Sequence, residues 1–126
     1  MSKKAIHTDN APAAIGTYSQ AIEAAGLVFL SGQIPLVPAT MEIVDGDFEV
    51  RARQVFENLQ AVAEAAGSNL NNAVKITVFL TDLTNFAMVN SVMEDFFEWP
   101  LPARAAVGVA SLPKGVDIEA DAILAI

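Results

Sequence analysis

Residues 48–80, FEVRARQVFENLQAVAEAAGSNLNNAVKITVFL, place a helical pattern directly before a strand pattern. In the first part, apolar residues recur at the spacing of a helix face: Val50, Val55, Leu59, Val62 and Ala66. Gly67 then supplies a C-terminal stop, so the pattern predicts a helix from about Phe48 to Ala66. From Val74 to Leu80 the apolar residues alternate as in a strand, and Phe79 makes the second face of that strand apolar too.

Further elements are predicted on both sides of this stretch. They are a strand at Leu27–Gln33, a second helix at Asn85–Glu98, and two final strands at about Arg104–Ala110 and Val116–Ile126. Pro100 and Pro102 end the second helix. Two helices that serve one mixed sheet indicate an α+β fold with both helices on one face. We expect residues 1–126 to form a single domain.

Composition and charge exclude several classes of protein. The chain has 53% hydrophobic residues, yet no apolar run approaches the roughly 18 residues of a membrane span. No apolar segment follows Met1–Lys4, so we see no signal peptide and expect a cytoplasmic location. Seven basic against fifteen acidic residues give a net charge of −8 without a basic patch, which argues against nucleic acid as a partner.

The metal-binding and nucleophilic residues are few. The absence of cysteine excludes disulfides, thiolate metal sites and a cysteine nucleophile. His7 is the only histidine and lies near the N-terminus, so no histidine pair can bind a metal. We therefore expect a surface histidine and a site without metal.

The apolar fraction is high for a chain of this size. Such a domain buries only about two thirds of its unfolded surface, so surplus apolar residues often form a subunit interface. Two helices on one face also leave the other face uncovered. We expect that face to carry Phe79 with the small residues Ala106, Gly108 and Ala110, and to pack against sister subunits.

The last two predicted strands carry charged residues that could form a site. If they pair as a hairpin with Val107 opposite Ile118, then Arg104 and Glu119 are diagonal neighbours on one face, with Cβ atoms roughly 7–8 Å apart. Only alanine and glycine lie between them, which indicates a pocket for a small anion. The same register sets Asp121 across from Arg104, so a structural ion pair is the alternative.

Two N-terminal segments offer weaker candidates. Tyr18 could line a pocket or only pack against its neighbours. Ser31 and Gly32, at the end of a predicted strand, could offer a hydroxyl and backbone N–H donors, or could simply form a bend.

Several short segments match one family in order and spacing: GTYSQA at 16–21, SGQIP at 31–35, TVFLTDL at 77–83, FAMVN at 86–90, PAR at 102–104, LP at 112–113 and IE at 118–119. Across essentially its whole length, the chain resembles the RidA family, also called the YjgF family. The resemblance implies a chorismate-mutase-like α+β fold and a barrel-like homotrimer with three clefts between subunits.

The resemblance also implies an activity. It is the hydrolytic deamination of reactive 2-imino and enamine acids, such as 2-iminobutanoate and 2-iminopropanoate, to 2-oxo acids and ammonia. These substrates are released by pyridoxal-phosphate-dependent dehydratases, and their removal protects against damage. The family enzyme needs no metal and no organic cofactor.

Residue by residue, the resemblance assigns roles to matching positions. Arg104 would hold the substrate carboxylate, and Glu119 would orient the attacking water together with the backbone carbonyl of Ala106. Four further residues would line the cleft, some from the neighbouring subunit: Tyr18, Ser31, Gly32 and Asn90.

Three positions depart from the family pattern, one of them Ala120, where a larger aliphatic residue is usual and a repacked core is the interpretation. Many members carry cysteine where this chain has Ala106, and an acidic or bulkier residue where it has Gly108. Alanine removes the thiol but keeps the backbone carbonyl, so deamination remains compatible with the change. A regulatory trimer that only binds 2-oxo acids through Arg104 is the alternative function. A ribonuclease is disfavoured by the net charge of −8 and the single histidine.

Overall fold

The computed structural model describes residues 2–126, which form one six-stranded mixed sheet with two α-helices. The strands are β1 (Lys4–Ile6), β2 (Ala21–Ala24), β3 (Leu27–Gln33), β4 (Ala73–Leu80), β5 (Ala103–Gly108) and β6 (Ile118–Ala125). The helices are α1 (Phe48–Ala65) and α2 (Phe86–Glu94), with short 3-10 turns η1 (Leu70–Asn72), η2 (Leu83–Asn85) and η3 (Pro113–Gly115). The strand order is β1-β2-β3-β6-β4-β5.

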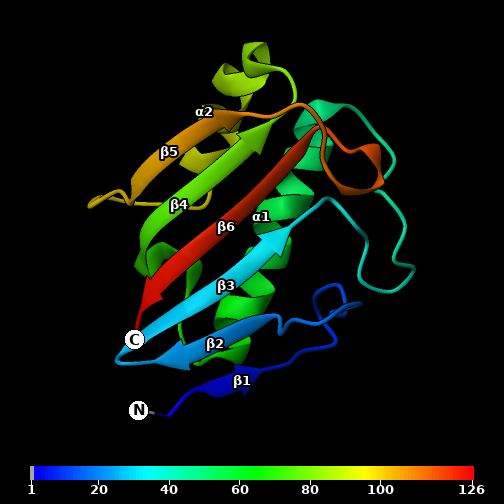
Figure 1. The fold of residues 1–126 in the computed structure, drawn as a ribbon. Helices are drawn as coiled ribbons and strands as arrows, with labels where there is room; N and C mark the ends of the chain where they lie inside the picture. Colours follow the sequence, from blue (N-terminus) through cyan, green and yellow to red (C-terminus); the bar gives the residue numbers. More distant parts are fainter. Residues whose placement is uncertain (1) are drawn as a thin grey trace.

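Both helices lie on the same face of the sheet, as Figure 1 shows, so the predicted α+β arrangement is confirmed. The Asp47 carboxylate caps α1 by accepting a hydrogen bond from the Val50 N–H. The apolar stripe of α1, including Val55, Leu59 and Val62, is fully buried against the inward residues of β3 and β6. None of the helices in residues 2–126 is long and apolar enough to span a membrane.

Most predicted elements agree with the structure to within one or two residues, but α2 ends at Glu94 instead of Glu98. Beyond it, the Phe96 and Phe97 rings both pack on Phe56, with ring centroids 5.7 and 6.2 Å away. Successive residues of a helix point about 100° apart. Ending the helix early therefore allows both rings to reach the core.

The predicted hairpin of the last two strands is wrong. β6 lies between β3 and β4 and is antiparallel to both, whereas β5 lies at the sheet edge, parallel to β4. The β4–α2–β5 segment is a strand–helix–strand crossover, which produces parallel pairing. β6 alternates between buried and half-buried residues along its whole length, as suits a central strand, while β5 carries mostly small side chains and is largely exposed.

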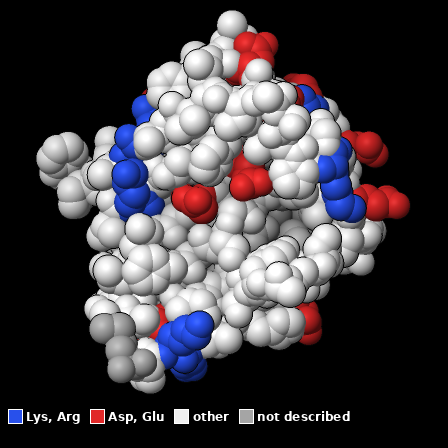
Figure 2. Space-filling model, in the orientation of Figure 1, with Lys and Arg blue, Asp and Glu red and all other residues white. Residues whose placement is uncertain are grey.

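The sheet face opposite the helices is uncovered within this chain, and we call it the outer face. It carries Phe79, as predicted, together with the exposed side chains of Phe29 and Val107. Figure 2 shows this face as mainly uncharged, with two acidic patches near its centre. Ala106 and Gly108 do not lie there as predicted. They share the helix side with Arg104, because β5 pairs with β4 rather than with β6.

Candidate functional site

The site begins at a β-bulge between β3 and β6. Leu30 pairs with Ala122 and Gln33 with Ala120, so Ser31 and Gly32 together stand opposite Asp121. A bulge of this kind places two residues against one and redirects their side chains.

The bulge brings Gly32 against the carboxylate of Glu119. A Cβ atom on residue 32 would lie 2.5 Å from Glu119 Oε2 and 3.0 Å from its carboxyl carbon. Both distances are shorter than a normal van der Waals contact. The position of this carboxylate therefore depends on the missing side chain of Gly32.

A cleft with a volume of about 470 Å³ opens beside this carboxylate. We call it the Glu119 cleft. Its lining comes from the N-terminal loop, the bulge, the loop after β3, η3 and β6: Pro12, Ala13, Ile15, Tyr18, Ser31, Gly32, Gln33, Ile34, Leu36, Met41, Pro113, Lys114 and Glu119. Four of the predicted site residues are thus brought together: Tyr18, Ser31, Gly32 and Glu119.

Hydrogen bonds hold the polar residues of this cleft in place. The Ser31 hydroxyl donates to the carbonyl of Ser19 at 2.5 Å, and the Ser31 N–H donates to the carbonyl of Gln20 at 3.0 Å. The first of these bonds uses the only proton of the Ser31 hydroxyl, so any further partner must donate to its oxygen. The Tyr18 hydroxyl accepts from the Ile15 N–H at 3.4 Å, and the side chain remains half exposed.

The two neighbouring acids of β6 have altered proton affinities. Burial, and to a lesser degree the charge of Asp121, raises the pKa of Glu119. Burial also raises the pKa of Asp121, while Lys75 and the Thr77 hydroxyl act in the opposite direction. A carboxyl group with a raised pKa accepts and returns a proton more readily near neutral pH, as a general acid–base group must.

Arg104 lies elsewhere, beside α2. Its Nη1 donates to Asn90 Oδ1 at 2.5 Å, and its guanidinium carbon is 4.6 Å from the centroid of the Phe86 ring. Arg104 and Asn90 line a second cleft of about 540 Å³, together with Met93, Glu94, Phe97, Leu101 and Pro102. We call it the Arg104 cleft.

Arg104 and Glu119 therefore do not share a face, and this prediction from the hairpin is wrong. Arg104 pairs with the buried Ile76, whereas Glu119 pairs with Phe79. Ile76 and Phe79 are an odd number of residues apart on β4, so their side chains point to opposite faces.

The alternative cross-strand ion pair is also absent from the described residues. Asp121 pairs with Thr77, and Arg104 forms no ion pair within residues 2–126. Ala106 pairs with the buried Val78 and lies on the same side as Arg104. No group of three histidine or acidic side chains in residues 2–126 is arranged to hold a metal ion.

Sequence reasoning missed part of the Glu119 cleft. Met41 and Lys114 line it, and both have positive φ angles of 60° and 58°. The only sequence signal was the adjacent Gly115, with φ of 70°, in the turn at Pro113–Gly115. Neither residue belongs to a periodic segment, so no pattern placed it near Glu119.

Comparison with known proteins gives consistent results. The chain matches the model of the endoribonuclease L-PSP family over residues 8–126. It is 54% identical over 125 residues to protein DfrA of Myxococcus xanthus, covering 98% of this chain and 95% of that protein. It is 44% identical to the 2-iminobutanoate/2-iminopropanoate deaminase of Mus musculus, covering 96% and 90% of the two chains.

A solved structure agrees with the fold. The crystal structure of RidA from the Antarctic bacterium Psychrobacter sp. PAMC 21119 superposes with a TM-score of 0.93 at 52% identity, covering 98% of this chain and 99% of that one. The residues of both clefts lie within the family match. The chain therefore belongs to the endoribonuclease L-PSP family, which includes RidA.

Proposed function

We propose that this protein is a cofactor-independent deaminase, which hydrolyses 2-imino and enamine acids such as 2-iminobutanoate and 2-iminopropanoate. The observation that carries the proposal is the division of the site. One chain presents an arginine cleft and a carboxylate cleft on opposite faces of its sheet. Some relatives in the family are named for this deaminase activity.

The division supports a site between two copies of the chain. A small imino acid cannot contact Arg104 and Glu119 of one chain at once, because the sheet separates them. The uncovered outer face offers apolar side chains, including Phe29 and Val107, to a neighbouring copy. A closed homotrimer, with the Arg104 cleft of one subunit against the Glu119 cleft of the next, would complete three such sites.

Each cleft then has a chemical role. The planar guanidinium of Arg104 donates two parallel hydrogen bonds to the substrate carboxylate, which places the C=N carbon. The Asn90 Oδ1 accepts a hydrogen bond from Arg104 Nη1 and so holds the guanidinium group in place. Glu119 and the backbone carbonyl of Ala106 accept hydrogen bonds from a water molecule, while Tyr18, Ser31 and Gly32 shape the cleft around it.

The reaction balances without a cofactor. Glu119 takes a proton as the water oxygen attacks C2, and the C=N π electrons move to nitrogen. Glu119 returns that proton to the nitrogen, which gives the carbinolamine. It then takes the hydroxyl proton as the C=O bond forms and passes this proton to the nitrogen, so the C–N bond breaks and ammonia leaves. One imino acid and one water become one 2-oxo acid and one ammonia.

The direct test is ammonia release in a coupled assay. A pyridoxal-phosphate-dependent threonine dehydratase supplies fresh 2-iminobutanoate, and semicarbazide competes for the imine. The purified protein should accelerate ammonia formation and reduce trapping by semicarbazide. If it binds 2-oxobutanoate in calorimetry without accelerating hydrolysis, it is a ligand-binding regulatory protein and the catalytic proposal fails.

A further inference from the structure

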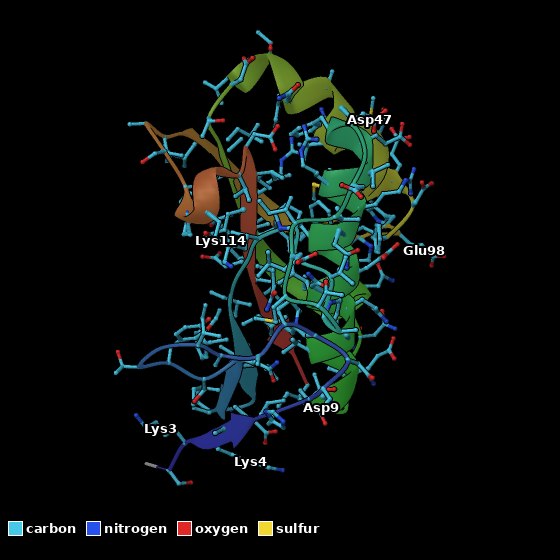
Figure 3. The ribbon with its side chains drawn as sticks, turned by 90° about the vertical axis from the view of Figure 1, so that its right-hand side faces the viewer. Lys3, Lys4, Asp9, Asp47, Glu98 and Lys114 are labelled. Atoms are coloured by element: carbon cyan, nitrogen blue, oxygen red, sulfur yellow. The ribbon has the colours of Figure 1, made fainter. Side chains whose placement is uncertain are left out.

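Two segments outside the sheet form part of the wall of the Glu119 cleft, and we call them its two walls. The first is the loop 34–47, whose Leu36 and Met41 line the cleft. The second is the connection 111–117, whose η3 residues Pro113 and Lys114 line the cleft; Lys114 is labelled in Figure 3. Neither wall belongs to a strand of the sheet, so the spacing between them depends on contacts that link them directly.

The first wall is internally ordered. Leu36 and Ile43 form an isolated β-bridge, and the N–H of Val37 donates to the carbonyl of Glu42 at 2.8 Å. At its base, the buried Asn58 amide of α1 donates to the carbonyl of Leu36 at 2.9 Å. These bonds hold the loop together as a unit and tie its base to α1.

Arg51, in the first turn of α1, joins the ends of both walls. Its Nη1 donates to the carbonyl of Gly46 at 2.7 Å. Its Nε and Nη2 donate to Asp117 Oδ1 and Oδ2 at 3.0 and 2.8 Å. Gly46 lies one residue before the end of the loop and Asp117 ends the connection, so one guanidinium group holds both.

The environment of this contact distinguishes it from an ordinary surface ion pair. The side chains of Arg51 and Asp117 are only 25% and 29% exposed, and the two hydrogen bonds are parallel. The hydrogen bonds that Arg51 donates to Asp117 raise the pKa of Arg51. Asp117 is itself tied to β4, because its carbonyl accepts from the Thr81 N–H at 3.3 Å.

We propose that Arg51 is a positioning residue, which sets the spacing between the two walls of the Glu119 cleft through Gly46 and Asp117. Glu119 follows Asp117 by two residues, so the same contact also fixes the start of the strand that carries the catalytic carboxylate. The inference about wall spacing stands on the contacts above. Its kinetic consequence rests on the proposed function.

The chain contains a matched control for this residue. Arg53 lies on the same helix and also forms ion pairs, with Asp95 at 2.8 Å and with Glu49 at 3.2 Å. It contacts neither wall of the Glu119 cleft. Arg51→Gln and Arg53→Gln therefore remove the same charge from the same helix, but only the first removes the link between the walls.

Hydrogen–deuterium exchange measured by mass spectrometry, beside steady-state kinetics and melting curves, tests the proposal. Arg51→Gln should exchange faster in segments 34–47 and 111–117, with the core strands unchanged. KM for the imine should rise on the order of tenfold, more than kcat falls, because the cleft is no longer held at its binding width. For Arg51→Lys, the exchange rates and KM should lie between those of the wild type and those of Arg51→Gln. One ammonium group cannot contact both Asp117 oxygens and the Gly46 carbonyl together.

Two results would overturn the proposal. One is that Arg51→Gln exchanges no faster than Arg53→Gln in segments 34–47 and 111–117. The other is faster exchange along the whole chain with a lower melting temperature, which would make Arg51 a general stabilising residue. If the wild-type protein neither binds 2-oxobutanoate nor releases ammonia, the proposed function fails, and the exchange data still decide the role of Arg51.

Discussion

Replacing Gly32 with alanine should separate catalysis from stability. The new Cβ would lie 2.5 Å from Glu119 Oε2, where about 3.5 Å is the normal contact distance, so the carboxylate must move by about 1 Å. A misplacement of that size can cost about 10²-fold in rate, and we expect a loss of this order in kcat.

The fold should tolerate the same change. The clashing atom is the end of a flexible side chain, and Gly32 does not have a positive φ angle. A Gly→Ala change at such a position stabilises by about 0.4–1 kcal/mol through the unfolded state, which offsets the cost of moving Glu119. The melting temperature should therefore stay close to that of the wild type.

The assay is ammonia release from enzymatically generated 2-iminobutanoate, measured beside a melting curve. Gly16→Ala is the control, because its Cβ would meet only Tyr18 ring carbons at an ordinary 3.5 Å. Wild-type turnover in Gly32→Ala would refute the argument that Gly32 positions Glu119. A large fall in melting temperature would show that the residue serves the fold instead.

Arg104→Lys should leave the melting temperature nearly unchanged but lose most imine hydrolysis and weaken 2-oxobutanoate binding in calorimetry, since an ammonium lacks the guanidinium fork. Glu119→Gln should cut turnover by about 10²–10⁴-fold, and Asp121→Asn far less; equal losses in the steady-state assay would indicate a charge network. Because the folded chain raises the pKa of both carboxyl groups, it holds protons that the unfolded chain has released, and stability falls as pH rises through these values. The melting temperatures of Glu119→Gln and Asp121→Asn should therefore exceed that of the wild type at neutral pH but not in acid. EDTA and iodoacetamide should not change turnover, because the chain has no cysteine and one histidine.

Strong periodicity made the helix α1 and the strand β4 predictable, because their apolar residues recur at one spacing over many residues. The strand β3 was predictable as a short apolar run bounded by Gly26 and by Pro35. The position of β5 was not predictable in this way. Its residues are mostly small, so the side-chain pattern does not distinguish the two faces, and neighbours in sequence are usually neighbours in a sheet.

The candidate site, like β5, could be predicted only in part from the sequence. Tyr18, Ser31, Gly32 and Glu119 are drawn together by a β-bulge and by loops, whose geometry no periodic pattern reveals. The sequence analysis placed Arg104 and Glu119 on one face because it paired their two strands as a hairpin. These strands, β5 and β6, are not paired in the structure. Arg104 and Glu119 can work together only if they come from different copies of the chain.

Subunit complementation tests this central claim most directly. Arg104→Ala and Glu119→Gln should each be inactive alone, because every site lacks one of its two groups. When the two variants are co-expressed and mix at random in a ring, about one quarter of the sites should combine an intact Arg104 with an intact Glu119. Ammonia release should then recover to about one quarter of the wild-type rate. No recovery in mixed oligomers, whose mass and composition are verified by light scattering and mass spectrometry, would contradict a site shared between subunits.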